Sequence, residues 1–166
     1  FDLLSLHSDI NFNATFYEYP SPLFCCIKHR NLVIFKKLIV NPKVDINGSS
    51  STVSYISNQY DSSKSEDDPG NKVLISMLSL LLHLDRFDPN TGTSFSQMGI
   101  FVAYEKRAYP LLKLLINSPK VNLNCKNLKY ETLLQRAIID GDELVFKLLM
   151  EAYHDVNRVD RKLDLN

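Results

Sequence analysis

The segment that decides the fold reads ETLLQRAIIDGDELVFKLLM and covers residues 131–150. Thr132 suits a helix N-cap, because its hydroxyl can accept a hydrogen bond from a free amide of the first turn. Gly141 suits the left-handed position that ends a helix. The segment therefore predicts two short helices, neither stable alone, that must pack against neighbouring units. Their apolar residues recur at helical spacing: Leu133, Leu134, Ala137 and Ile138 in the first helix, and Val145, Phe146, Leu148 and Leu149 in the second.

A short triplet recurs just after leucine-rich runs, which indicates an internal repeat. Its first residues lie 36, 43, 34 and 33 positions apart, which is the period of a two-helix unit plus a turn. Repeats of this kind build binding surfaces, so a scaffold is favoured over an enzyme. The copies are Asp9-Ile10-Asn11, Asp45-Ile46-Asn47, Asp88-Pro89-Asn90, Asn122-Leu123-Asn124 and Asp155-Val156-Asn157.

The starts of two further units read SPLFCC at residues 21–26 and MGIFVA at residues 98–103. Together with the triplets, they resemble the ankyrin repeat, whose first helix opens with T-P-L-H-x-A. The resemblance implies an all-α fold, an ankyrin-like helical solenoid of about four helix-turn-helix repeats. The family's Thr and His tie neighbouring turns together, and this chain replaces them, for example by Ser21 and Phe24. We therefore expect weaker polar ties between repeats, with Phe24 and Phe101 substituting apolar packing.

On this alignment we expect the chain to be a single ankyrin-repeat domain over residues 1–166 and a fragment of a longer protein. Four repeats are expected, flanked by the tail of a preceding repeat and by the start of a further repeat or a cap. The tail is 1–12, the repeats are 13–47, 48–90, 91–124 and 125–157, and the last segment is 158–166.

The second repeat is longer than the others, and its insert is expected over residues 60–72. Residues 61–70 read DSSKSEDDPG and hold no large apolar side chain, which predicts a disordered acidic loop. The flanking helices are expected within 51–59 and over 72–86. Ser63 and Ser65 each stand three residues before an acidic residue and are candidates for phosphorylation, with a solvated spacer as the alternative.

Bulk composition argues against several functions. Nineteen basic and nineteen acidic residues cancel, so neither direct binding of nucleic acid nor attraction to an anionic membrane surface is expected. The longest apolar stretch falls well short of the roughly 20 residues that span a bilayer. Three cysteines, two of them adjacent, favour a reducing compartment and hence an intracellular location, in cytoplasm or nucleus. The four histidines are dispersed and no phosphate-binding or nucleophile motif occurs, so we expect no metal, no cofactor and no enzymatic activity.

The resemblance implies that a protein or peptide partner binds the turns between repeats and the exposed side of each first helix. Aromatic residues on these turns are candidate anchors, although they could equally pack against their own hairpins. The first turn, residues 16–19, is expected to be about two residues longer than usual. The alternative function is an intramolecular regulatory domain that docks a neighbouring catalytic or DNA-binding domain, and the oligomeric state is left open. The candidate contacts are Tyr17, Glu18, Tyr19, Lys28, His29, Phe95, Glu105, Lys106, Lys129, Tyr130, Arg136 and Asp140, together with the outward-facing Val102 and Ile139.

Overall fold

The computed structural model describes residues 10–15, 21–47, 51–92 and 98–154. Within these ranges the protein is all-α, with eight helices and no strand, as predicted. Phe95, residues 16–20 and the segment 155–166 lie outside the described residues, so the predictions for them stay predictions. The helices are α2 (Pro22–Lys28), α3 (Leu32–Ile39), α4 (Thr52–Gln59), α5 (Pro69–Leu82), α6 (Gly99–Glu105), α7 (Tyr109–Asn117), α8 (Leu133–Asp140) and α9 (Glu143–His154).

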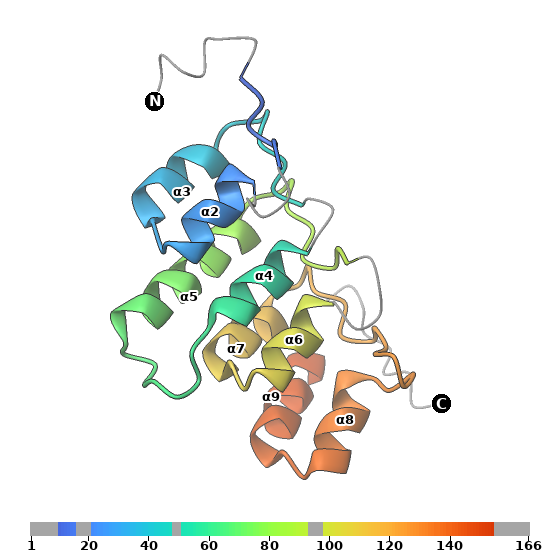
Figure 1. Cartoon of the computed structure of the whole chain (residues 1–166). Helices are drawn as coiled ribbons and strands as arrows, with labels where there is room; N and C mark the ends of the chain where they lie inside the picture. The colour runs from blue at the N-terminus through green and yellow to red at the C-terminus, as the bar shows by residue number, and fades with distance from the viewer. Residues whose placement is uncertain (1–9, 16–20, 48–50, 93–97, 155–166) are drawn as a thin grey trace.

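Consecutive helices pack in four pairs, α2 with α3, α4 with α5, α6 with α7 and α8 with α9. The pairs follow one another along the molecule from the N-terminal to the C-terminal end (Figure 1). One row of contacts joins α2, α4 and α6, and a second joins α3, α5, α7 and α9. Both rows bury one continuous apolar core, to which every pair contributes a fully buried residue such as Phe35, Leu78, Leu112 or Val145. Each such side chain adds about 1.5–3 kcal/mol of stabilisation on burial.

A residue in the left-handed conformation turns the chain between the helices of three pairs. These residues are Arg30, Arg107 and Gly141, with φ of 54°, 51° and 67°. The amide after each one donates to the carbonyl five residues earlier, at 2.8, 2.9 and 2.8 Å respectively, which is the Schellman arrangement. The expectation for Gly141 is confirmed, whereas Arg30 and Arg107 adopt the same backbone without the conformational freedom of glycine.

The acidic insert of the second pair has a defined conformation, so the prediction of a disordered loop over 60–72 is wrong. Asn71 is buried and donates to the carbonyls of Asp61 and Ser65, at 3.0 and 3.3 Å. Asp68 caps α5, since its carboxylate accepts from the amides of Gly70 and Asn71 at 2.9 and 3.1 Å. Helix α5 consequently begins at Pro69, three residues before the expected start, and ends at Leu82 rather than at residue 86.

Arg30 of the first pair anchors the second pair through the same region. Its guanidinium donates to the carbonyl of Gln59 at the end of α4, at 3.0 Å. A Cβ added to Gly70 would lie 2.8 Å from Nε of Arg30, so glycine permits this close approach. The insert is therefore packed against its neighbour and is part of the folded structure.

Asparagine side chains form a ladder between successive pairs. Asn13, Asn47 and Asn90 each accept a hydrogen bond from the first backbone amide of the next triplet, at 2.7, 2.9 and 2.8 Å. Each also donates to the carbonyl two residues before that triplet, at 2.8, 3.0 and 2.8 Å. The last residue of the triplet thus supplies polar ties between the pairs. The expectation of weaker ties concerned the replaced Thr and His of the first helices, which these bonds do not involve, and it stays a prediction.

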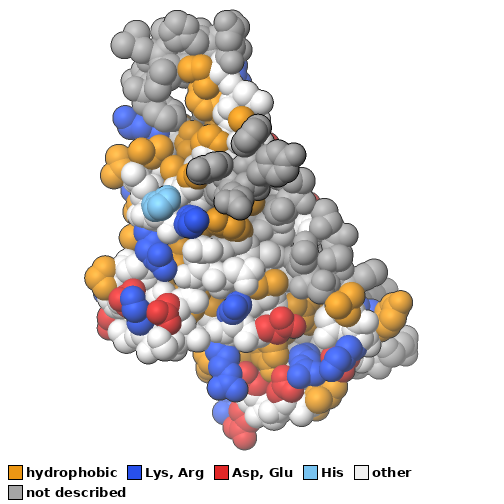
Figure 2. Space-filling view, in the orientation of Figure 1, with side chains coloured by type: hydrophobic (Ala, Val, Ile, Leu, Met, Phe, Trp, Pro, Cys, Tyr) orange, Lys and Arg blue, Asp and Glu red, His pale blue; other side chains and the backbone are white. Residues whose placement is uncertain are grey.

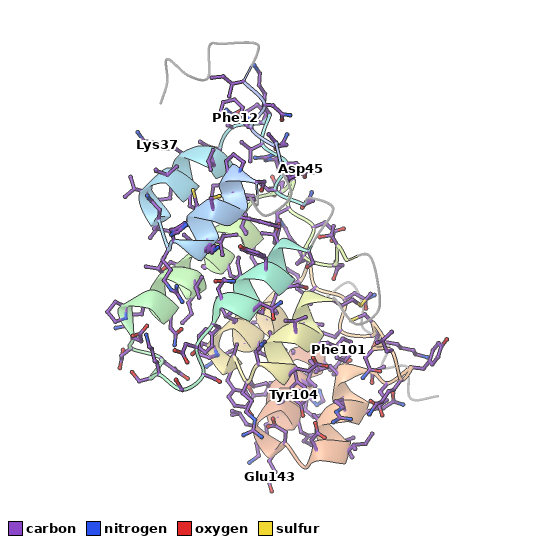
Figure 3. The ribbon with its side chains drawn as sticks, viewed as in Figure 1. Phe12, Lys37, Asp45, Phe101, Tyr104 and Glu143 are labelled. Carbon is purple, nitrogen blue, oxygen red and sulfur yellow. The ribbon has the colours of Figure 1, made fainter. Side chains whose placement is uncertain are left out.

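The ladder also corrects the register of the first triplet, which is Asn11-Phe12-Asn13 rather than Asp9-Ile10-Asn11. The backbone amide of Asn13 donates to the side chain of Asn11 at 2.9 Å, as that of Asn47 donates to Asp45 at the same distance. Phe12 is buried like Ile46, and Figure 3 shows Phe12 and Asp45 in the same part of the molecule. The interval to the second triplet becomes 34 residues, equal to the interval between the third and fourth triplets, while the prediction of a longer first turn at residues 16–19 lies outside the described residues.

A basic side chain adds a second tie at two of these junctions. Arg86 donates to the carbonyls of Ile39, Asn41 and Val44 at 2.8, 3.0 and 2.7 Å. Lys120 donates to the carbonyl of Leu84 at 2.6 Å. These cations bind backbone carbonyls at or just beyond the ends of α3 and α5, a favourable position for positive charge.

Candidate binding cleft

The first helices of the second and third pairs are in close contact. A Cβ added to Gly99 of α6 would overlap the side chain of Val53 on α4. Ser57, six residues after the N-cap of α4, is buried as well and donates to the carbonyl of Val53 at 2.9 Å. This interface leaves no room for a ligand.

A cleft of about 770 Å³ opens between α6 and α8, the first helices of the third and fourth pairs. Acidic and basic side chains intermingle over this part of the face in Figure 2. Figure 3 places Phe101 and Tyr104 on the α6 side of the space between the two helices. The lining residues are Phe101, Tyr104, Glu105, Arg107, Tyr109, Asn127, Leu128, Lys129, Arg136, Asp140 and Asp142.

Two tyrosine hydroxyls bridge the helix pairs at the cleft. Tyr104 donates to Asp140 at 2.9 Å, and Tyr109 donates to Asp142 at 3.1 Å. Burial raises the pKa of Tyr104, and its hydrogen bond to Asp140 raises that pKa further. The pKa of Tyr109 is raised in the same way by burial and then by Asp142. Both phenols therefore remain protonated donors at neutral pH.

The carboxylates that accept these bonds, Asp140 and Asp142, each have further partners. Arg136 contacts Asp140 through Nε at 3.0 Å and through a terminal nitrogen at 2.9 Å, and it lies 3.7 Å from Glu131. Asp142 accepts from the amide of Val145 at 3.1 Å in the first turn of α9. Asp142 thus joins a tyrosine of one pair to the second helix of the next.

A hairpin turn, residues 127–131, forms one rim of the cleft. Asn127 accepts from the amide of Tyr130 at 2.9 Å, and its side chain accepts from the amides of Lys129 and Glu131 at 2.9 and 3.0 Å. Tyr130 adopts the left-handed conformation with φ of 61°. Leu128 and Tyr130 are 62% and 75% exposed, so this turn presents apolar groups to solvent.

The structure brings together only part of the predicted contact set. Glu105, Lys129, Arg136 and Asp140 line the cleft. Tyr130 and Lys106 are exposed and adjoin lining residues in the chain without lining the cleft themselves. Lys28 and His29 are exposed on the first pair and do not line the cleft, while Tyr17, Glu18, Tyr19 and Phe95 lie outside the described residues.

Three side chains differ in burial from the sequence prediction. Val102, expected to face outward, is only 8% exposed, whereas Ile138 and Phe146, expected on packed faces, are 59% and 37% exposed. Val102 belongs to a helix enclosed by its neighbours, and Ile138 belongs to the last pair described. Ile139 is exposed as predicted.

Sequence reasoning missed several residues of the site, among them Tyr104, Arg107, Tyr109 and Asp142. The signal for Tyr104 was its position, six residues after the first residue of MGIFVA, where the first repeat carries the apolar Ile27 and the second carries Ser57. A tyrosine there can bury its ring while its hydroxyl seeks a partner. The partner itself is 36 residues further along the chain.

The candidate phosphorylation sites lie on the insert, away from the cleft. Ser63 and Ser65 are exposed on the insert, and the hydroxyl of Ser63 donates to Asp61 at 2.6 Å. In the ranges that the structure describes, no three His, Cys, Asp or Glu side chains gather at a spacing that would hold a metal ion. None of the eight helices combines the length and the apolar character needed to cross a bilayer.

Comparison with protein-family models, with curated proteins and with solved structures found no match to this chain.

Proposed function

We propose that the chain is an ankyrin-like helical solenoid that binds a protein or peptide partner in the cleft between α6 and α8. Three features support the solenoid: the two rows of helix contacts, the left-handed turns and the asparagine ladder, each recurring from pair to pair. Stacked pairs of this kind offer an extended surface to a partner rather than an enclosed active site.

The observation that carries the proposal is the combination of an open cleft with exposed apolar groups on its rim. Large rigid side chains such as Tyr130 supply contact area at a low cost in conformational entropy, and they are enriched among the residues that dominate binding energy. The mixed charges of the lining side chains favour specificity and register over bulk affinity.

The test compares two doubly substituted proteins in capture of cellular proteins by crosslinking and quantitative mass spectrometry. Leu128→Ser with Tyr130→Asn removes the apolar rim, and asparagine tolerates the left-handed backbone of residue 130. Val33→Ser with Val40→Ser is the matched control, because both valines are exposed on α3 or at its end, away from the cleft. We expect specific partners to be lost from the first variant and kept by the control. Equal recovery by both, with helicity unchanged, would reject the proposal.

A further inference from the structure

Exposed large apolar side chains lie at the two ends of the stack of helix pairs (Figure 1). Among the residues that the structure describes, none of them belongs to the second or third pair. Apolar groups gathered on a surface in this way mark sites of contact with other molecules. They are Val33, Ile34 and Val40 at the first pair, and Leu128, Tyr130, Ile138, Ile139, Leu144 and Phe146 at the last pair and the turn before it.

One position of the second helices is covered by the preceding pair. It lies four residues before a buried leucine, which is Leu38, Leu81, Leu115 or Leu149 in the four pairs. In the second, third and fourth pairs the residue at this position is fully buried, as Met77, Leu111 and Val145. In the first pair it is Ile34, which is 42% exposed, because no described pair precedes it.

The first helices show the same difference at the residue after the N-cap. Gly99 of α6 takes this position and meets Val53 of the preceding α4. Its counterparts Thr52 and Leu133 are buried as well, whereas Pro22 in the first pair is only half-buried. Pro22 and Ile34 therefore belong to the face that would meet a preceding pair, and we call it the head face.

Two other positions are covered by the following pair. Ile138 lies six residues after the N-cap of α8, and Phe146 lies three residues before Leu149. Both are exposed in the last pair, and we call the face that they form the tail face. Their counterparts in the first three pairs are all buried: Ile27, Ser57 and Tyr104 for the first position, and Phe35, Leu78 and Leu112 for the second.

The head face and the tail face are the two halves of the junction that recurs inside the stack. At each inner junction a tail-face position of one pair and a head-face position of the next are buried together. A second copy of the chain brings a head face to the tail face of the first. Stacking of that kind repeats the nearest-neighbour contacts of the inner pairs and needs no new geometry.

The net charges of the two end pairs favour contact between unlike ends. Residues 22–39 of the first pair hold four cations and no carboxylate, whereas residues 133–154 of the last pair hold four carboxylates and two cations. A positive end meeting a negative end is attractive, and two like ends repel each other. The cations are Lys28, Arg30, Lys36 and Lys37 at the first pair and Arg136 and Lys147 at the last, where the carboxylates are Asp140, Asp142, Glu143 and Glu151.

We infer that copies of this chain associate head to tail, with the first helix pair of one copy stacked on the last pair of another. The contact uses surfaces at the ends of the stack and leaves the cleft between α6 and α8 open. It is heterologous, so each complex keeps one free head face and one free tail face and can grow further.

Sedimentation velocity of the whole chain tests this inference, with a reducing agent present because its cysteines are free. The weight-average mass should rise with protein concentration between about 10 µM and 1 mM. It should not level off at the mass of a dimer, because a heterologous contact does not close. Added salt should weaken the association, since unlike net charges contribute to it.

Substitutions test each face separately. Ile34→Gln changes the head face and Ile138→Gln the tail face, and both side chains are exposed enough for the fold to be kept. Each substitution should weaken the association about tenfold, the loss expected for one buried isoleucine. Val33→Gln is the matched control and should have no effect, because Val33 and its counterpart Leu144 are exposed in both end pairs and so face no neighbouring pair.

An equimolar mixture of the two variants reports the arrangement. The Ile138→Gln protein keeps its head face and the Ile34→Gln protein keeps its tail face. The mixture should therefore form a complex of one copy of each, which grows no further, at concentrations where either variant alone is monomeric.

Three results would overturn the inference. One is a constant monomer mass over the whole concentration range, and another is association that neither isoleucine substitution weakens. The third is self-association of the Ile34→Gln protein alone while the Ile138→Gln protein stays monomeric, since last pairs would then meet each other. None of these results bears on the proposed cleft, whose test depends on Leu128 and Tyr130.

Discussion

Helices α4 and α6 pack in direct contact, whereas α6 and α8 stand apart around a cleft. The side chain six residues after each N-cap differs in size between the two interfaces. It is Ser57 on α4, which bonds its own helix and lets α6 approach until Gly99 meets Val53. It is Tyr104 on α6, which reaches across to Asp140. The residue at this position thus differs between the interface that is closed and the one that leaves a cleft.

The first prediction breaks the closed interface. Gly99→Ala should lower the free energy of unfolding by about 2–4 kcal/mol, because the new Cβ overlaps Val53 and well-packed helices must separate. Urea denaturation followed by circular dichroism measures the change. A loss below about 1 kcal/mol would show that α4 and α6 can separate without much cost.

The asparagine ladder gives the next largest effect. Asn47→Ala leaves the amide of Asp88 and the carbonyl of Arg86 without their partner, at a cost of about 1.5–3 kcal/mol. Asn58→Ala serves as the control, since Asn58 is exposed on α4 and has no hydrogen bond to these groups. Equal unfolding midpoints for the two variants would contradict a structural role for the ladder.

The insert provides a related test. Asn71→Ala should cost about 1–3 kcal/mol, because it leaves the backbone of Asp61 and Ser65 without its partners. Ser62→Ala, at an exposed site of the same loop, should change little. Retained stability in Asn71→Ala would restore the view of the insert as a passive spacer.

A substitution at the interface between α6 and α8 should lower the free energy of unfolding by a smaller amount, and this amount should depend on pH. Tyr104→Phe removes one hydrogen bond, at about 0.5–1.5 kcal/mol near neutral pH. Because the pKa of Tyr104 is raised on folding, its contribution is fully present below the unfolded value near 10 and is lost as pH rises above that value. Stability of the native protein should therefore fall by up to about 1.4 kcal/mol per pH unit above pH 10 through this group, and Tyr104→Phe should abolish that part of the slope. Parallel alkaline profiles for the two proteins would exclude a coupling between this phenol and folding.

The smallest effect is expected at the helix turns. Arg107→Gly should stabilise the fold by about 0.5–1 kcal/mol, because glycine adopts a φ of 51° without strain. Arg30→Gly should not show this gain, since it also removes the hydrogen bond to Gln59. If both substitutions raise the melting temperature, the relief of backbone strain at residue 30 outweighs the loss of the hydrogen bond to Gln59.

Local patterns allowed much of the fold to be predicted from sequence. The apolar spacing, Gly141 and the cap Thr132 located α8 and α9, because helix formation depends on residues three or four apart in the chain. Thr132 and Gln135 even form the reciprocal capping box, with bonds of 3.3 and 2.8 Å. The apolar spacing also located the other three pairs, although α6 and α7 have no side-chain cap.

Register and order of the loops could not be predicted in this way. Asp9-Ile10-Asn11 and Asn11-Phe12-Asn13 offer similar triplets, and only the bonds from Asn13 to residues 43 and 45 distinguish them. Likewise the polar composition of the insert predicted disorder, yet the side chain of Asn71 donates hydrogen bonds to two backbone carbonyls of the insert. Both outcomes depend on partners six or more residues away, which a local pattern does not contain.

The periodic apolar residues and caps of this chain specify paired helices of a set length, since those interactions act within one or two turns. The periodic residues do not specify whether two neighbouring helix pairs pack in contact or leave a cleft. That depends on which side chains meet at the interface between the pairs. Gly99 against Val53 closes one junction, and Tyr104 against Asp140 leaves the next one open. The candidate binding site is thus a property of the assembled repeats, with Tyr104, Arg107 and Asp142 drawn together from two of them.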